Sequence, residues 1–286
     1  QGLKCVEMET SPFGLGLSVW LQNVYEKLGF RIWGNHSWHQ GFPSNLVFVT
    51  TPHTSQYEGQ LAYLASLLRE EHKEAAVEDA AQVASHYNGQ TLYRAFYLYE
   101  HSKEITFLLH EKHCPPSELF MESKLPLALA WDDASGADPL LREIFPPTWV
   151  VKPGFPHPFS SWMAVAELPA SKRRYVLKLA GLSEGSSWGE NVYFLHKTSK
   201  ERCRSLLENA LAGPEIYILQ EYLQGKKFAQ TWYDFTSQSE QTMHGRVRLT
   251  PYVNPQNGEI LSAKIAMREN TELIHGATDA VITTVC

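Results

Sequence analysis

The stretch YVLKLAGLSEGSSWG, residues 175–189, decides how the whole chain is interpreted. Its first five residues predict a short strand that carries Lys178 near its end, facing the loop that follows. That loop holds three glycines and three serines. Glycine lets a backbone approach a ligand closely and turn successive N–H groups around phosphate oxygens. Lys178 adds a mobile positive charge for the same phosphates. The stretch therefore predicts a phosphate-binding loop, and the alternative is an ordinary hairpin loop between two strands.

The loop is not of the Walker A type, because its lysine precedes the glycines and no Gly-Lys-Ser/Thr follows. Downstream, residues 216–223 are mostly apolar and predict a second strand, which ends in the polar pair Gln220–Glu221. An adenine base needs an apolar slot and an acceptor for its amino group. The end of this strand offers both.

Basic residues follow on the next predicted strands. Lys226 and Lys227 come first, and Arg246 and Arg248 lie two positions apart on a later strand. Residues two apart on a strand share a face, so the two arginines point the same way and call for anionic partners. The alternative is a solvated or salt-bridged face of a sheet.

The remaining pattern predicts an α+β layout. Asn257–Gly258 between residues 246–253 and 260–267 is a strong hairpin signal. Ser199 is expected to cap a helix that stops at Gly213. In the amino-terminal half, residues 46–50 read as a buried strand, and a helix is expected from about Gln56 to His72. Further helix is expected over residues 77–101, a strand over 105–109, and a helix over 19–28 with Ser18 as its cap.

Composition excludes some functions. The formal net charge of the 286 residues is -6, without a long basic block, which argues against nucleic-acid binding. No apolar run approaches the ~20 residues that a membrane span needs. The four cysteines lack CxxC spacing, so we expect reduced thiols and a cytoplasmic protein. Because the chain begins at Gln1 rather than methionine, we also expect it to be trimmed or processed.

The order of these features resembles the ATP-grasp superfamily, which includes glutathione synthetase and D-alanine–D-alanine ligase. A lysine on a strand, a Gly/Ser loop, an apolar strand ending Gln-Glu-Tyr and arginine-bearing strands cover residues 147–286. The resemblance implies an amino-terminal βα domain, residues 1–145. It also implies a two-lobed nucleotide-binding domain with antiparallel sheets over residues 146–286.

The resemblance implies roles for individual residues. The expected ATP contacts are Lys152, Lys178, Gly181, Gly185, Ser186, Ser187, Gly189, Gln220, Glu221, Tyr222 and Leu223. Arg246 or Arg248 would hold the γ-phosphate. Residues near the chain's end add Arg268 as a phosphate ligand and His275 as a base for the incoming amine. The alternative for His275 is a turn-stabilising role.

The metal motif departs from the family pattern. ATP-grasp enzymes hold magnesium on acidic residues and an asparagine, commonly Glu-x-Asn, which this chain lacks. Glu269, Asn270 and Asp279 have the oxygen ligands that Mg²⁺ prefers. We therefore expect ATP and Mg²⁺ as cofactors, with a rearranged metal site or a degenerate lobe.

The resemblance implies an ATP-dependent ligase. It would activate a small-molecule or peptide carboxylate as an acyl phosphate, which an amine or thiol then attacks. A non-catalytic nucleotide-binding or interaction module is the alternative, and a small-molecule kinase is a third possibility.

Overall fold

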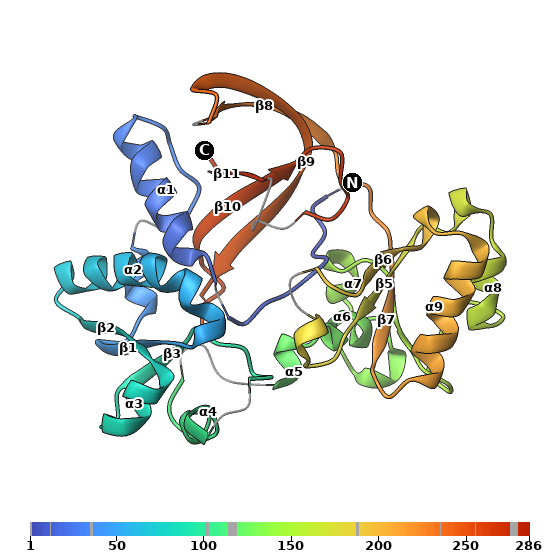
Figure 1. Ribbon diagram of the computed structural model, residues 1–286, viewed down its shortest axis with the longest axis horizontal. Coiled ribbons are helices and arrows are strands. Elements are labelled where there is room, and N and C mark those ends of the chain that lie inside the picture. Colours follow the sequence, from blue (N-terminus) through green and yellow to red (C-terminus); the bar gives the residue numbers. More distant parts are fainter. Residues whose placement is uncertain are drawn as a thin grey trace. The chain divides into compact units, whose positions relative to one another are not determined.

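A computed structural model describes residues 2–11, 13–34, 37–100, 103–113, 119–186, 189–234, 236–254, 256–274 and 280–286 (Figure 1). The chain forms two compact units, and each unit is built from two separated segments. Unit 1 comprises Gln1–Glu9 and Glu118–Gln224, and unit 2 comprises Thr10–Ser117 and Gly225–Cys286. The fold combines a parallel sheet with two antiparallel sheets and is therefore α+β, as predicted.

The first layer of unit 2 is a three-stranded parallel sheet in the order β2-β1-β3. Its strands are β1 (Asn45–Thr50), β2 (Glu74–Asp79) and β3 (Thr91–Arg94). The helices of this part are α1 (Leu15–Lys27), α2 (Glu58–Glu70), α3 (Ala80–His86) and α4 (Lys103–Leu108). β1 leads into α2 and on into the parallel strand β2, so the predicted strand and helix are part of a βαβ unit.

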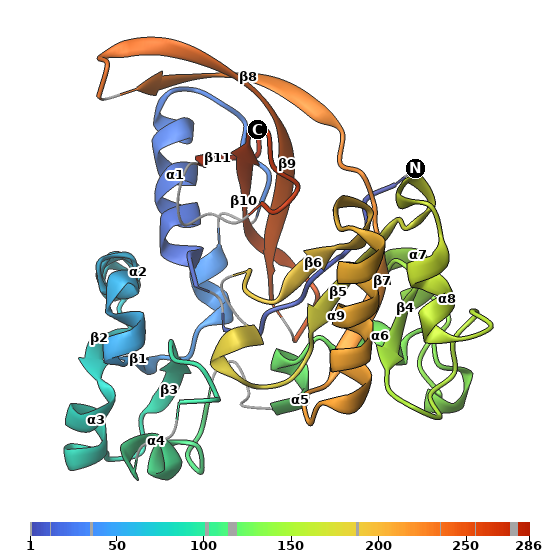
Figure 2. The ribbon, with the colours of Figure 1, turned by 45° about the vertical axis from the view of Figure 1, so that its right-hand side comes forward.

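The second sheet of unit 2 is antiparallel, in the order β11-β10-β9-β8. Its strands are β8 (Lys227–Asp234), β9 (Ser239–Val253), β10 (Ile260–Arg268) and β11 (Val281–Thr284). The predicted hairpin joins β9 to β10, with Gly258 at a φ of 73°. Helix α1 lies against this sheet, and the Ser18 hydroxyl is 2.7 Å from that of Ser262 on β10 (Figure 2).

One apolar core joins the two sheets of unit 2. It contains Val19 of α1, Phe48 of β1 and Leu64 of α2, together with Tyr252 of β9 and Leu261 of β10. The parallel and antiparallel sheets are therefore buried together rather than as separate domains.

Unit 1 is built on a four-stranded antiparallel sheet in the order β4-β7-β5-β6. Its strands are β4 (Thr148–Val151), β5 (Tyr175–Leu179), β6 (Val192–Phe194) and β7 (Tyr217–Glu221). Its helices are α5 (Leu119–Glu122), α6 (Leu125–Leu129), α7 (Leu141–Ile144), α8 (Trp162–Glu167) and α9 (Lys200–Ala212). As predicted, α9 begins at Ser199, whose hydroxyl accepts the Arg202 N–H at 3.1 Å, and ends at Gly213.

Three local predictions were wrong. Residues 105–109 belong mostly to α4 rather than to a strand, and residues 77–101 contain parts of β2 and β3 besides α3. The short strand β3 has four buried residues and no alternation, so its sequence pattern does not separate it from a helix. Ser18 lies inside α1 instead of capping it, because the helix already begins at Leu15.

The two compact units do not follow the expected division into residues 1–145 and 146–286. The compact units are defined by contacts within the folded chain, whereas the expected division follows the domains of a protein family. The boundary between residues 145 and 146 therefore stays a prediction. None of the described helices combines the length and hydropathy that a bilayer crossing requires.

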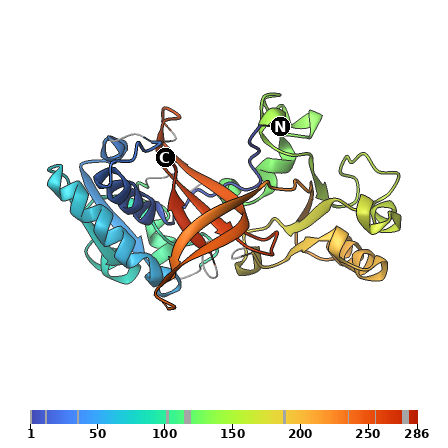
Figure 3. The same ribbon diagram turned by 90° about the horizontal axis from the view of Figure 1, so that it is seen from above.

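Helices α1 and α2 approach each other closely in unit 2 (Figure 3, dark and lighter blue). A Cβ atom on Gly16 of α1 would lie 2.2 Å from the Gln60 carbonyl oxygen of α2. We expect Gly16→Ala to lower the free energy of unfolding by about 1–3 kcal/mol, because the added methyl forces the helices apart. Urea denaturation measures this change.

Gly59→Ala is the matched control, since a Cβ at Gly59 in α2 meets nothing within 4 Å. Alanine favours the helix over glycine, so this variant is expected to be neutral or more stable by up to ~1 kcal/mol. An unchanged free energy of unfolding in Gly16→Ala would show that α1 and α2 do not pack this closely.

Candidate functional site

Strand β5 places Lys178 on the face of the unit 1 sheet that lies away from α8 and α9. Leu177 on the opposite face packs with Val165 of α8 and Leu207 of α9. Ile218 lies directly opposite Lys178 on β7. It packs against α6, in an apolar cluster separate from the one that contains Leu177. Lys178 therefore lies on a face that combines apolar residues with the polar side chains of Gln220 and Thr148, and it is only 8% exposed.

The Lys178 ammonium group is held by hydrogen bonds inside unit 1. It donates to Gln220 Oε1 at 2.8 Å and to the Val6 carbonyl oxygen at 3.1 Å. Gln220 Nε2 then donates to the Thr148 hydroxyl at 3.2 Å, and this hydroxyl donates to the Pro146 carbonyl at 2.8 Å. The expectation that Lys178 simply faces the loop was wrong, because β5 buries it among these acceptors.

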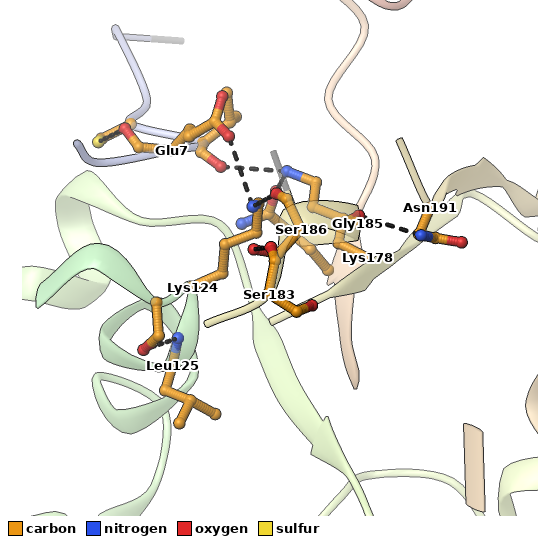
Figure 4. A network of polar contacts seen from close by, with 12 residues as sticks. Glu7, Lys124, Leu125, Lys178, Ser183, Gly185, Ser186 and Asn191 are labelled. Atoms are coloured by element: carbon orange, nitrogen blue, oxygen red, sulfur yellow. Dashed lines mark hydrogen bonds and ion pairs between the residues drawn. The ribbon is translucent and has the colours of Figure 1, made fainter. Parts of the chain in front are cut away.

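A second lysine lies in the same network (Figure 4). Lys124 donates to the Ser186 carbonyl oxygen of the glycine–serine loop at 2.6 Å, and its Nζ lies 3.7 Å from Glu7 Oε1. The side chains of Lys124, Lys178 and Glu7 together carry a formal charge of +1. An additional anionic group at this position would therefore meet a net positive charge.

The pKa of Lys178 is lowered to about 8, and burial is the largest cause. The Glu7 carboxylate acts in the opposite direction and raises this pKa, while the positive charge of Lys124 lowers it further. Burial also raises the pKa of the neighbouring Cys5 thiol, which therefore stays neutral. A phosphate that neutralised the two ammonium groups would remove part of the cost of burying Lys178.

The glycine–serine loop is described at Gly181–Ser186 and at Gly189, whereas Ser187 lies outside the described residues. Ser186 Oγ donates to the Ser183 carbonyl at 2.7 Å. A Cβ on Gly185 would lie 2.8 Å from Asn191 Nδ2, so glycine is needed there for close packing. Gly189 has a φ of 78°, a conformation that glycine adopts without strain.

The other residues expected to bind the nucleotide are not all brought together. Gln220 is turned into the Lys178 network, while Glu221 and Leu223 are exposed. Tyr222 is buried, and the Arg174 guanidinium lies 4.9 Å from the centre of its ring. Lys152 follows β4 and donates to the Gly213 carbonyl at 2.7 Å, where it caps the end of α9.

Unit 2 carries the arginines on one face of its antiparallel sheet. Lys227 of β8, Arg246 of β9 and Arg268 of β10 are direct cross-strand partners in a row. Arg248 lies two residues from Arg246 and shares its face. Arg268 also donates to the Leu273 carbonyl at 3.1 Å.

Adjacent like charges on one sheet face are unfavourable unless anions neutralise them. Arg246 shows this most clearly, because its Nε is buried and meets no acceptor within the described part of the chain. The predicted shared face of Arg246 and Arg248 agrees with the strand register, and the register also sets Arg268 directly opposite Arg246, which the sequence did not predict.

The expected metal ligands are not assembled by the described residues. Strand β10 ends at Arg268, and Asn270 follows in a bend with a φ of 58°, so the two do not share a strand face as expected. Glu269 and Asn270 are exposed. His275 and Asp279 lie outside the described residues. Among the residues that are described, no three His, Cys, Asp or Glu side chains could hold a metal ion.

Sequence reasoning missed Lys124, Glu7 and Thr148. Lys124 precedes α6 and Glu7 lies near the chain's start, far in sequence from the residues they contact. Nothing in their local pattern indicates a site. The sequence shows only that these polar residues stand beside apolar segments, and this pattern is too common in proteins to indicate a binding site.

The lowered pKa of Lys178 predicts a pH-dependent stability. Between about pH 8 and the ordinary value of 10.5, the unfolded chain binds a proton that the folded chain has released. The free energy of unfolding should therefore rise with pH across this range, by up to about 3 kcal/mol from this group. Lys178→Met should lack this rise. Urea denaturation of both proteins at pH 7.5 and pH 10 measures the difference.

Groups distant from Lys178 titrate equally in both proteins, so the comparison isolates Lys178 together with Cys5, whose pKa this lysine lowers. The same pH dependence in wild type and Lys178→Met would show that burial does not lower the pKa of this lysine.

Comparison with known proteins gives likenesses only among solved structures. No protein-family profile matches the sequence, and a search of curated proteins gives no match. Among solved structures, the crystal structure of D-cycloserine synthetase DcsG is similar over 79% of this chain and 75% of that one. The identity is 18% and the TM-score is 0.37. A superposition this loose carries no argument about a site or an activity.

Proposed function

We propose that this protein is an ATP-dependent ligase, which joins a carboxylate to an amine or thiol through an acyl phosphate. The observation that carries the proposal is the pair of lysines at the glycine–serine loop. Lys178 is buried with a pKa of about 8, and Lys124 bonds the loop itself at Ser186. A buried positive charge that exceeds its nearby counter-charge suits a polyanionic ligand such as the ATP phosphates.

In this proposal the two lysines bind the α- and β-phosphates. Lysine acts on phosphate as a mobile point charge with three donors, so both side chains can turn to new acceptors. Glu7 is the counter-ion that Lys124 has at present, at 3.7 Å. A phosphate oxygen would compete with the Glu7 carboxylate for the same ammonium group.

The arginines of unit 2 are a separate candidate phosphate-binding group, proposed from their arrangement within that unit. Arg246, Arg248 and Arg268 share a face of one sheet and supply planar donor groups that match phosphate oxygens in pairs. Positive charge is most useful where negative charge develops during phosphoryl transfer. The Nε atom of Arg246 is buried and bonds no acceptor among the described residues, so an anion could take that position.

The chemistry has two steps. A carboxylate oxygen of the substrate attacks the γ-phosphorus of ATP, the bond to the bridging oxygen breaks, and ADP leaves. The nitrogen or sulfur of the acceptor then attacks the carbonyl carbon of the acyl phosphate, phosphate leaves, and the acceptor loses its proton. ATP is therefore the proposed cofactor. No cluster of three His, Cys, Asp or Glu side chains that could hold a metal ion occurs among the described residues, and both steps are written with the protein's own cations.

A second candidate is a nucleotide-binding module without ligase activity. It is favoured by the two hydrogen bonds that Lys178 already makes to Gln220 and Val6 within the protein itself. Such a module would bind ATP but would not release ADP with any carboxylate and amine. Turnover in the presence of a panel of amino acids separates the two functions.

Two variants with opposite expected effects test the ATP site. Lys124→Met should weaken ATP binding about ten- to a hundredfold, because it removes a charge-assisted hydrogen bond to phosphate. Glu7→Gln should strengthen binding, because it removes the carboxylate that competes for Lys124. Isothermal titration with ATP, with and without Mg²⁺, measures both affinities.

Lys172→Met is the control, since Lys172 is exposed on the same unit and contacts neither lysine. Its affinity for ATP should equal that of the wild type. If wild type binds no ATP, both proposed functions fail. If Lys124→Met and Glu7→Gln bind as wild type does, ATP binds elsewhere.

A further inference from the structure

The outer edge of β8 is the most exposed strand edge of unit 2. Strand β8 ends the sheet order and pairs with β9 along its whole length, so its other side faces no strand among the described residues. The first five residues of β8 are all exposed, on both faces of the ribbon. Phe228 is 44% exposed and Tyr233 is 48% exposed. Long exposed edges of this kind are templates for strand addition.

Symmetry limits how this edge can pair with itself. A two-fold axis perpendicular to a sheet makes neighbouring strands antiparallel and continues each face of the sheet across the interface. Paired residues must therefore come from the same face of the strand, which means that their numbers differ by an even amount. Registers centred on a single residue satisfy this condition.

We propose that β8 pairs antiparallel with β8 of a second copy of this chain, in a register centred on Gln230. This register places Lys226 of each copy opposite Asp234 of the other, at both ends of the interface. It also places Phe228 opposite Trp232. The two antiparallel sheets then form one continuous sheet across the two-fold axis.

The charges at the two ends are held in position by local contacts. Lys226 Nζ lies 5.5 Å from the centre of the Phe228 ring. Asp234 accepts hydrogen bonds from the Thr236 N–H at 2.9 Å and from Ser237 Oγ at 2.7 Å. The bond from Ser237 is the main reason why the pKa of Asp234 is lowered, so this carboxylate is ionised at neutral pH.

The neighbouring register is less favourable. A register centred on Thr231 would set Phe228 opposite Asp234 and leave Lys226 beyond the paired region. It would therefore replace two ion pairs with two contacts between a ring and a carboxylate. Cross-strand pairs of opposite charge and of aromatic rings each stabilise a sheet, so the Gln230 register is favoured over the Thr231 register.

The charges at the two ends of β8 favour pairing with a second copy of this chain over pairing with an unrelated strand. Any extended peptide can satisfy the backbone groups of β8, but two lysines begin this edge and an aspartate ends it. An antiparallel partner must present an acidic residue at one end and a basic residue at the other. The chain's own β8 meets that demand. One strand pair buries little surface, so the dimer should be weak and dependent on concentration.

Charge exchange tests the pairing. Sedimentation equilibrium of the wild type should show a monomer and a dimer whose proportions change with concentration. Lys226→Asp and Asp234→Lys should each weaken the dimer at least about tenfold, because two attractive pairs become repulsive. The double variant Lys226→Asp/Asp234→Lys should regain dimerisation, because the charges are complementary again.

Glu208→Lys controls for net charge, since it makes the same change as Asp234→Lys on an exposed position of α9. It should dimerise as the wild type does. Lys226→Asp keeps the turn contacts of Asp234, so its loss of dimer cannot be ascribed to an altered hairpin. A wild type that stays monomeric, or a double variant that does not recover, overturns the proposal.

Cysteine crosslinking tests the register independently. Gln230→Cys should form a disulfide-linked dimer on oxidation, because residue 230 opposes itself across the axis. Thr231→Cys should crosslink no more than the wild type, whose own cysteines set the background. Crosslinking at residue 231 and not at 230 would overturn the proposed pairing.

Discussion

The buried ammonium group of Lys178 is the constraint on which unit 1 depends. A charged group cannot be taken out of water unless polar partners surround it, so β5 can carry a lysine there only because Gln220, Val6 and Glu7 lie close by. These partners come from β7 and from the amino-terminal segment. One charge thus ties together segments that are more than 170 residues apart.

The arginine face of unit 2 also brings positive charges close together, but by strand pairing rather than by burial. There the cations are set side by side by strand register, across β8, β9 and β10. Unit 1 places its cations in a polar network, whereas unit 2 places them in a row. Each arrangement, within its own unit, gathers positive charge that an anionic ligand can offset.

Much of the fold was predictable from local chemistry. Ser199 and Gly213 mark the ends of α9 because a cap and a helix stop act on the nearest residues. The Asn257–Gly258 turn and the short strand that carries Lys178 are equally local. The strand β3 and the helix α4 were missed, because short buried segments take their structure from what covers them.

The site was predictable only where strand periodicity determines it. The shared face of Arg246 and Arg248 follows from their spacing, but the burial of Lys178 does not, because it depends on Val6 and Thr148 in distant segments. Lys152 shows that a position can match a sequence pattern while its side chain makes a different contact. Its sequence position resembles that of a ligand-binding lysine, and the structure uses it to cap a helix.

The division of each unit into two segments also affects the order in which the chain can fold. Unit 1 needs its first nine residues as well as residues up to 224, and unit 2 needs β11 near the end of the chain. During synthesis, neither core can close until most of the polypeptide has left the ribosome. Segments far apart in sequence must then find each other, which slows folding and leaves apolar surface exposed for longer. Such a chain depends more than a string of independent domains on protection from aggregation while it is being made.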